Sequence, residues 1–209
     1  MPPPKVVAWD VNETLISLAG LEPLLPDGAM PLWFARILRD GFAHAATGQA
    51  RSFAELAATH LRGVVDDPDA VLTAFRQLDA YPDARPALER LRDAGVRSVT
   101  LTNGAKAVTE ALMAHNDLAD LFERYLSVDD VGVWKPRPEP YQHAAKVCGV
   151  DPADVALVAV HSWDIHGAKS AGLATGWCSR LEGSFVDGFA EPDVRGDDLV
   201  SVVESLLAR

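Results

Sequence analysis

Residues 6–15 read VVAWDVNETL and place one carboxylate at the end of a short apolar run. The apolar residues lie between residues 2–5 (PPPK) and residues 12–14 (NET), which predicts a buried strand. Aspartate is a poor strand former and its charge is costly to bury unpaired, so Asp10 fits the loop at the strand's carboxyl end. There Asp10 can take part in catalysis or only cap the following segment.

The composition is that of a globular protein with a large buried interior. The chain has 209 residues, of which 48% are hydrophobic, enough for one large domain or a core with an inserted subdomain. Nineteen basic and thirty acidic residues give a net charge of -11, which argues against nucleic acid and anionic membranes as partners.

The cysteine content and the hydropathy of the chain predict its cellular compartment. Cys148 and Cys178 are the two cysteines and have no CxxC spacing, and the N-terminus lacks the pattern of a signal peptide. No apolar run approaches the roughly 18 residues of a membrane span. We therefore expect a reducing, cytoplasmic location.

Helices and strands alternate from about residue 84 onward. Strands are predicted at 97–102, 125–127, 155–160 and 174–178, and helices at 85–94, 105–115, 141–148, 165–171 and 199–207. Strands separated by helices imply right-handed crossovers and a parallel sheet covered on both faces. The predicted fold class is therefore α/β with a Rossmann-like parallel sheet.

Residues 16–83 interrupt this alternation. Nothing there reads as a strand, while residues 31–46, 53–64 and 70–78 carry helical apolar spacing. We expect a core formed by residues 1–15 and 84–209, with residues 16–83 as an inserted all-helical cap subdomain. Such an insertion would lie over the carboxyl ends of the strands, where ligands of open α/β sheets bind.

Four short segments carry a resemblance to a known family. They are residues 10–14 (DVNET), 102–104 (TNG), 133–136 (VWKP) and 163–164 (WD). Their order resembles the motif series of the haloacid dehalogenase superfamily of hydrolases. Together with Tyr141, they resemble most closely the L-2-haloacid dehalogenases (type II).

The resemblance implies a reaction. In that group the first aspartate attacks carbon 2 of a small 2-haloalkanoic acid and displaces halide with inversion. The aspartyl ester that remains is then hydrolysed by water. By resemblance Asp10 is the nucleophile, the partner is a small 2-haloacid, no cofactor is required, and the protein is a homodimer.

Three further residues are candidates for the catalytic group. A nearby ammonium keeps a carboxylate charged, and Lys135 lies in a frame stiffened by prolines, although a surface lysine would fit the same frame. Thr14 is expected to hydrogen-bond Asp10. Asp164 can cap a helix, pair with Lys135 or orient water.

The segment after the second predicted strand offers donors for an anion. Thr102 and Asn103 supply a hydroxyl, an amide and backbone N–H groups, which suit a substrate carboxylate and a departing halide. Alternatively, Asn103 and the following glycine only turn the chain. Tyr141 reaches either Asp164 or the substrate carboxylate, or simply packs at a helix start, and Trp163 is expected to line the binding site.

The halide is expected to need a positive group. In the family an arginine directly follows a tryptophan on the first long helix of the insertion, whereas here Phe34 follows Trp33. Arg36 lies near Trp33 on a helical wheel and Arg39 lies at the opposite edge of the apolar arc. We expect Arg36, beside Trp33, to bind the halide, with Arg39 as the alternative.

Three positions depart from the family pattern. Asn12 replaces a bulky aromatic residue of the substrate site, and Ala159 and His161 stand where that group has Ser and Asn. His161 can act as a base for ester hydrolysis or be a structural imidazole bonded to backbone. The remaining histidines show no metal-ligand pattern, so no metal site is predicted.

Two other functions stay open. One is a magnesium-dependent small-molecule phosphatase of the same superfamily. Against it, Asn12 cannot protonate a leaving alkoxide, and Val160 occupies the expected place of a metal-binding carboxylate. The other is a catalytically idle protein that binds a small carboxylate.

Overall fold

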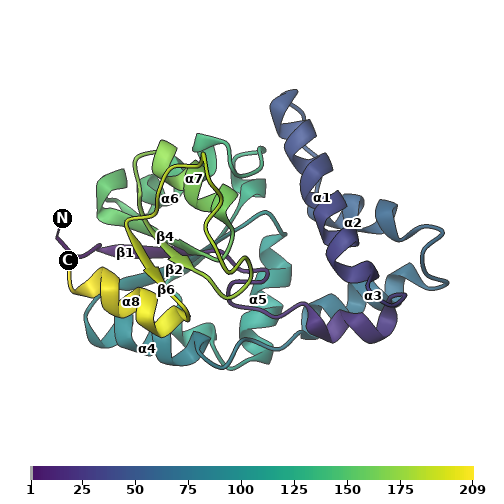
Figure 1. Ribbon diagram of the computed structural model, residues 1–209, viewed down its shortest axis with the longest axis horizontal. Helices are drawn as coiled ribbons and strands as arrows, with labels where there is room; N and C mark the ends of the chain where they lie inside the picture. The colour runs from purple at the N-terminus through teal and green to yellow at the C-terminus, as the bar shows by residue number, and fades with distance from the viewer. Residues whose placement is uncertain (1) are drawn as a thin grey trace.

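The apolar run at residues 6–9 forms strand β1 (Val6–Trp9) in the interior of a parallel sheet. The computed structural model, which describes residues 2–209, gives the strand order β3-β2-β1-β4-β5-β6 (Figure 1). The other strands are β2 (Arg97–Thr102), β3 (Arg124–Ser127), β4 (Val155–Ala159), β5 (Ala174–Cys178) and β6 (Val194–Gly196). Every neighbouring pair is parallel, so the predicted α/β, Rossmann-like fold class is confirmed.

Helices cover both faces of this sheet because successive strand side chains point to opposite sides. Val6 and Ala8 pack with helices α6 (Pro138–Cys148) and α7 (Ser162–Ser170). Val7 and Trp9 belong to the core cluster of the other face. That face is covered by α4 (Ala84–Asp93), α5 (Lys106–His115) and α8 (Leu199–Leu207). Figure 1 shows α6 and α7 above the sheet and α4 and α8 below it. Within residues 2–209, no helix has both the length and the apolar character that crossing a membrane requires.

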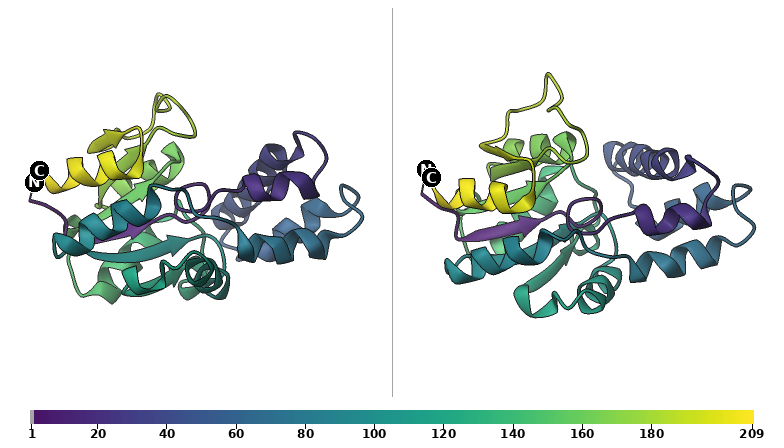
Figure 2. Two further views of the ribbon diagram at one scale, coloured as in Figure 1. Left: turned by 90° about the horizontal axis from the view of Figure 1, so that it is seen from below. Right: turned by 60° about the horizontal axis from the view of Figure 1, so that its bottom comes forward.

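Residues 16–83 form a helical segment beside the sheet. It contains α1 (Ala29–Ala46), α2 (Phe53–Leu61), α3 (Pro68–Ala74) and the short 3-10 helices η1 (Ala19–Leu24) and η2 (Phe75–Gln77). Both views of Figure 2 place these helices at one end of the sheet. The chain leaves and returns at one point, where Ile16 and Ala80 form an antiparallel bridge.

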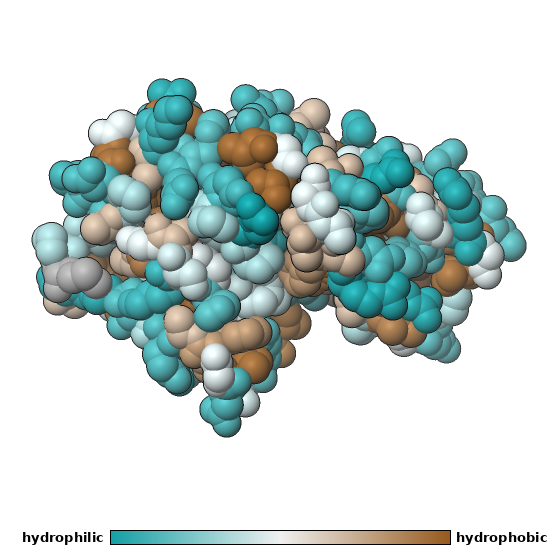
Figure 3. All heavy atoms as spheres, turned by 90° about the horizontal axis from the view of Figure 1, so that it is seen from above, coloured by the Kyte–Doolittle hydropathy of each residue, from teal (hydrophilic) through white to brown (hydrophobic). Residues whose placement is uncertain are grey.

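Trp134 links the helical segment to the loop that carries Lys135. Its indole N–H donates to the Arg51 carbonyl at 2.7 Å, and its ring stacks on Phe53 with 6.2 Å between centroids. On α1, Gly41 faces the same ring, and a side chain there would collide with it. Seen from above, the surface in Figure 3 is notched between the larger body and the helical segment.

Three differences from the expected elements have physical reasons. Strand β6 was not predicted because it has only three residues and none is fully buried. Helix α6 begins three residues before the expected start because prolines fit the first helical turn. Helix α7 also begins three residues early, so Asp164 lies in its first turn rather than in a loop.

The contact between Gly41 and Trp134 predicts a stability effect. Gly41→Val should lower the free energy of unfolding by about 1–3 kcal/mol, because the added side chain overpacks the Trp134 ring. Ala43→Val is the matched control, since Ala43 is exposed on the same helix. Urea unfolding of both variants measures the difference, and equal stabilities would contradict this packing argument.

Candidate active site

Lys135 joins two carboxylates at the carboxyl edge of the sheet. Its Nζ donates to Asp10 Oδ1 at 2.9 Å, to Asp164 Oδ2 at 2.6 Å and to the Leu101 carbonyl at 2.8 Å. Asp10 follows β1, Leu101 belongs to β2, and Asp164 follows β4, so three adjacent strand ends meet at one ammonium. Lys135 is fully buried and is therefore not a surface lysine.

Opposing effects act on the charges of this group. Burial by itself lowers the pKa of Lys135, but the charges and hydrogen bonds of Asp10 and Asp164 outweigh it and raise that pKa above its ordinary value. Burial raises the pKa of the Asp164 carboxyl, while Lys135 acts in the opposite direction. With Lys135 charged and both carboxylates ionised, the three side chains carry one net negative charge. Asp10 is the carboxylate that reaches the pocket, since Asp164 is fully buried.

Thr14 fixes the second oxygen of Asp10. Its hydroxyl donates to Asp10 Oδ2 at 2.7 Å and accepts the Val160 N–H at 3.2 Å. Each Asp10 oxygen therefore has one protein donor, because Lys135 holds the other. The expected hydrogen bond between Thr14 and Asp10 is present.

Tyr141 supports Asp164 from behind. Its hydroxyl donates to Asp164 Oδ1 at 2.6 Å, and burial together with that carboxylate raises the tyrosine pKa well above its usual range. Tyr141 is fully buried and does not line the pocket beside Asp10. Gly167 permits this approach, because a Cβ there would lie 2.6 Å from the tyrosine oxygen.

A small pocket lies in front of Asp10. Its walls come from the carboxyl ends of β1, β2 and β4 with the residues that follow them, and from helices α1, α2 and α7. They consist of Asp10, Asn12, Phe34, Leu38, Phe53, Thr102, Asn103, His161 and Trp163. A water-sized sphere can occupy about 10 Å³ there, which is roughly the room that one water molecule needs. A substrate must therefore displace side chains of the helical segment as it enters.

Asn103 brings an unsatisfied donor to this pocket. Its Oδ1 accepts the Lys135 backbone N–H at 3.0 Å, but its buried Nδ2 has no hydrogen-bond partner within residues 2–209. Leaving a buried donor unpaired costs about 1–3 kcal/mol, so an acceptor on a ligand would be favourable here. Thr102 Oγ1 accepts the Gly104 N–H at 2.9 Å and thereby shapes the turn. The segment thus both turns the chain and presents a donor.

The structure does not bring Arg36 and Trp33, which we expected to bind the halide, into this pocket. The face of α1 that lines the pocket carries Phe34 and Leu38, and Arg36 lies two residues from each, about 200° around the helix. Arg36 is exposed, and so is Arg39, whose side chain pairs with Asp40 at 2.6 Å.

Trp33 instead packs within the helical segment, where its indole N–H donates to the Ala57 carbonyl at 3.2 Å. Sequence reasoning also missed that Phe34, Leu38 and Phe53 line the pocket. The i, i+4 spacing of Phe34 and Leu38 was the available signal.

His161 and Asn12 both line the pocket. The His161 ring stacks on Trp163, with 5.4 Å between centroids, and on Phe34 at 6.4 Å. In the described part of the chain, the polar contact of the His161 ring is with Glu13, whose Oε2 lies 3.4 Å from Nε2.

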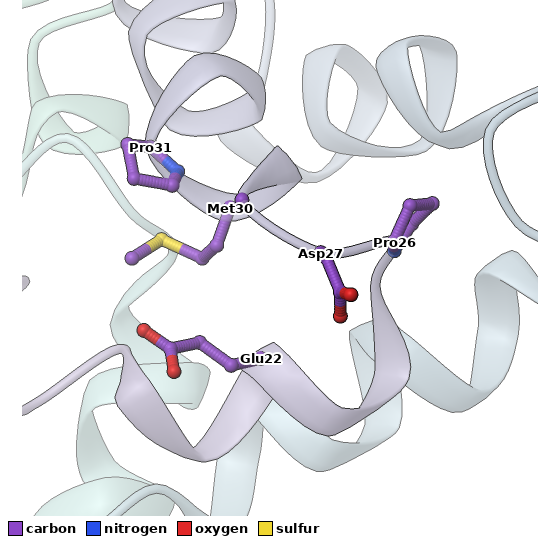
Figure 4. Close-up of a pocket in the computed structure, with 6 residues that line it drawn as sticks. Glu22, Pro26, Asp27, Met30 and Pro31 are labelled. Carbon is purple, nitrogen blue, oxygen red and sulfur yellow. The ribbon is translucent and has the colours of Figure 1, made fainter.

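A second pocket lies between η1 and the start of α1 (Figure 4). It is lined by Glu22, Pro26, Asp27, Gly28, Met30 and Pro31, and both carboxylates are on exposed residues. It holds no buried nucleophile or paired base. The chemistry therefore belongs to the pocket at Asp10.

The buried Lys135 group predicts a pH-dependent loss of stability. Lys135→Met should destabilise the protein by about 3–5 kcal/mol at pH 7, because two buried carboxylates lose their counter-charge. The carboxyl pKa values in the folded variant then rise, so the deficit should shrink as the pH falls through them. In the wild type, the stability from Lys135 is full below about pH 10 and is lost as the pH rises through its raised pKa.

Lys169→Met is the control for that measurement. Lys169 pairs with Asp193 at 2.6 Å, but its side chain is 34% exposed, and the loss should be about 1 kcal/mol or less. Denaturant unfolding between pH 5 and pH 8 compares both variants with the wild type. Similar losses of stability for the two variants would show that the buried Lys135 group stabilises the protein no more than the partly exposed Lys169 pair does.

Comparisons with known proteins agree with this geometry. The sequence profile of the haloacid dehalogenase-like hydrolases matches residues 4–172. The chain is 36% identical over 129 residues to (S)-2-haloacid dehalogenase 4A of Burkholderia cepacia, covering 62% of this chain and 55% of that protein. It is 30% identical over 159 residues to (S)-2-haloacid dehalogenase 1 of Pseudomonas sp. (strain CBS-3), covering 72% and 70%.

A solved structure is also similar to this chain. The L-2-haloacid dehalogenase of Xanthobacter autotrophicus with chloropropionic acid covalently bound superposes with a TM-score of 0.85 at 25% identity, covering 98% of each chain. The sequence match spans only about half the length of the Burkholderia relative. The family profile nevertheless matches well over half of this chain, which therefore belongs to the haloacid dehalogenase-like hydrolases.

Proposed function

We propose that this protein hydrolyses small 2-haloalkanoic acids through an ester formed on Asp10. The observation that carries the proposal is the Asp10 carboxylate, which is held by Lys135 and Thr14 and lines a small pocket. The relatives named as (S)-2-haloacid dehalogenases support the substrate class. The relative with chloropropionic acid covalently bound supports an ester intermediate.

The first half-reaction uses Asp10 as nucleophile. An Asp10 oxygen forms a bond to carbon 2 of the substrate from the side opposite the halogen. The carbon–halogen bond breaks, the halide leaves with the bonding electrons, and carbon 2 is inverted. Lys135 and Thr14 hold the carboxylate ionised and aimed, and the small pocket keeps bulk water from shielding it.

The halide is received without an arginine. The unpaired Nδ2 of Asn103 is the donor available in the pocket, and the rings of Phe34, Phe53 and Trp163 line the same space. Aromatic rings are positive at their edges, so they can face a departing anion. The Thr102 hydroxyl and the Asn12 amide are the remaining polar groups for the substrate carboxylate.

Residues 16–83 act as a cap subdomain over the core of residues 1–15 and 84–209. Support comes from α1 and α2, which supply Phe34, Leu38 and Phe53 to the pocket wall. Because so little room remains, the cap must move for substrate to enter and close again to exclude water. A homodimeric state and a cytoplasmic location stay predictions from the resemblance and the cysteine usage.

Oxygen labelling tests the nucleophile. In a single turnover of (S)-2-chloropropionate in heavy-oxygen water, the label should enter Asp10 and not the first product molecule, because product takes its oxygen from the carboxylate. Mass spectrometry of the Asp10 peptide and of the lactate measures this. Asp10→Asn is the control and should release no halide. Solvent oxygen in the first product would overturn the Asp10 ester.

Metal removal separates the proposal from the phosphatase alternative. Lys135 Nζ lies between Asp10 and Asp164 at 2.9 and 2.6 Å, so an ammonium fills the space that a magnesium ion would need. These residues do not fit a metal.

Chloride release from (S)-2-chloropropionate should therefore persist in excess EDTA and gain little from magnesium. A parallel screen of small phosphoesters is the control. Magnesium-dependent phosphate release would favour the phosphatase, and no turnover of either class would favour an idle binding protein.

A further inference from the structure

Glu13 has an unusual backbone conformation beside the nucleophile. Its φ is 64°, in the left-handed region that non-glycine residues seldom adopt. Its backbone N–H donates to the Ile16 carbonyl at 2.8 Å, which holds the tight turn after Asn12. Strained conformations of this kind cluster at functional sites, so the side chain that the turn presents is of interest.

The turn directs the Glu13 carboxylate to His161. Its Oε2 lies 3.4 Å from His161 Nε2, and the two side chains are only 12% and 7% exposed. Burial raises the pKa of the Glu13 carboxyl, with the charges of Asp10 and Glu182 acting in the same direction and His161 opposing them. A buried carboxylate in this place is therefore stabilised by a positive charge on the imidazole.

The imidazole is placed to meet a reactant. His161 lines the Asp10 pocket and its ring stacks on Trp163 and Phe34, which fixes the plane of the ring. Its Nε2 lies 3.4 Å from Glu13 Oε2, an ion-pair contact, and within residues 2–209 no hydrogen bond to the other ring nitrogen is found. A ring with one nitrogen beside a carboxylate and the other free has the arrangement of an oriented general base.

We propose that Glu13 is a positioning residue that holds His161 as the general base of ester hydrolysis. The inference rests on the proposed function, because it concerns the second half-reaction on the Asp10 ester. It assigns a role to Glu13, a charged residue at a backbone position where glycine would be less strained.

Hydrolysis of the ester passes through a tetrahedral intermediate. His161 takes a proton from water while the water oxygen bonds to the Cγ carbon of the Asp10 ester. The tetrahedral intermediate then breaks the bond between Cγ and the former Asp10 oxygen that is attached to carbon 2, and that alkoxide takes the proton from the imidazolium. Asp10 is regenerated with one solvent oxygen and its carboxyl proton passes to solvent. Glu13 stays ionised and stabilises the imidazolium throughout.

Rapid-quench mass spectrometry of the Asp10 peptide tests this proposal. In single turnovers of (S)-2-chloropropionate, Glu13→Gln should form the ester at the wild-type rate but hydrolyse it about 100-fold more slowly, the size of a general-base effect. His161→Ala should also accumulate ester. The double variant should be no slower than His161→Ala alone, because the two residues act as one unit.

The pH dependence of ester hydrolysis distinguishes this role from a structural one. The other charged groups around the pair are Asp10, Lys135 and Glu182. Removing the Glu13 carboxylate makes a charged imidazole less favourable, so the acid limb of the hydrolysis profile should move to lower pH. A residue that only supports the fold would leave that limb in place.

Two further variants serve as controls. Glu182→Gln removes a neighbouring charge that contacts Ser162 rather than His161, and it should leave the hydrolysis rate and profile unchanged. Glu13→Gly removes the carboxylate while relieving the backbone, so it should fold and still accumulate ester.

The outcomes separate the two proposals. If ester forms but Glu13→Gln and Glu13→Gly hydrolyse it at the wild-type rate, the role of Glu13 is wrong and the proposed function stands. Equal slowing of ester hydrolysis by Glu13→Gln and Glu182→Gln would also overturn it. The rate would then depend on the total negative charge near His161 and not on the Glu13 carboxylate itself. If no ester forms on Asp10 in any variant that retains His161, the proposed function itself fails.

Discussion

One buried ammonium organises this site. Lys135 is fully buried, and its three hydrogen bonds reach Asp10, Asp164 and the Leu101 carbonyl. These partners sit at or just beyond the carboxyl ends of three adjacent strands, so the parallel sheet is what allows them to meet. In turn, the ammonium can be buried only because two carboxylates and a carbonyl replace the water molecules that would otherwise hydrate it. The strand order of the sheet and the charges of the active site therefore depend on each other.

Most of the fold could be predicted because the hydrophobic periodicity of each core element agrees with the turn residues that bound it. Strands β2 and β5 and helix α8 were predicted with the bounds that the structure has, since each is a continuous apolar or amphipathic run. Asp10 and Asp164 were predicted from their places after buried strands and from the family resemblance, whereas Lys135, which lies well beyond the end of β3, was predicted mainly from that resemblance. Strand β6 was not, since three half-exposed residues carry almost no periodic signal.

The helical part of the pocket could not be predicted in the same way. A helical wheel gives the apolar arc of α1 but not which part of that arc faces the sheet and which faces α2. Trp33 and Phe34 are neighbours in sequence, yet Trp33 bonds to Ala57 of α2 while Phe34 lines the pocket. The rotation of α1 is set by tertiary contacts, notably Gly41 against Trp134, and it carries Arg36 to the outside.

Two carboxylates on one ammonium have a further use during the proposed cycle. When Asp10 becomes an ester it loses its negative charge, and Lys135 remains buried beside it. An unpaired buried ammonium would be costly, and it would favour loss of its proton. Asp164 prevents this, because it keeps its own 2.6 Å contact with Lys135 and is held by Tyr141 from the other side. The ammonium therefore stays paired in both halves of the reaction, and it remains charged to receive the Asp10 carboxylate when hydrolysis restores it.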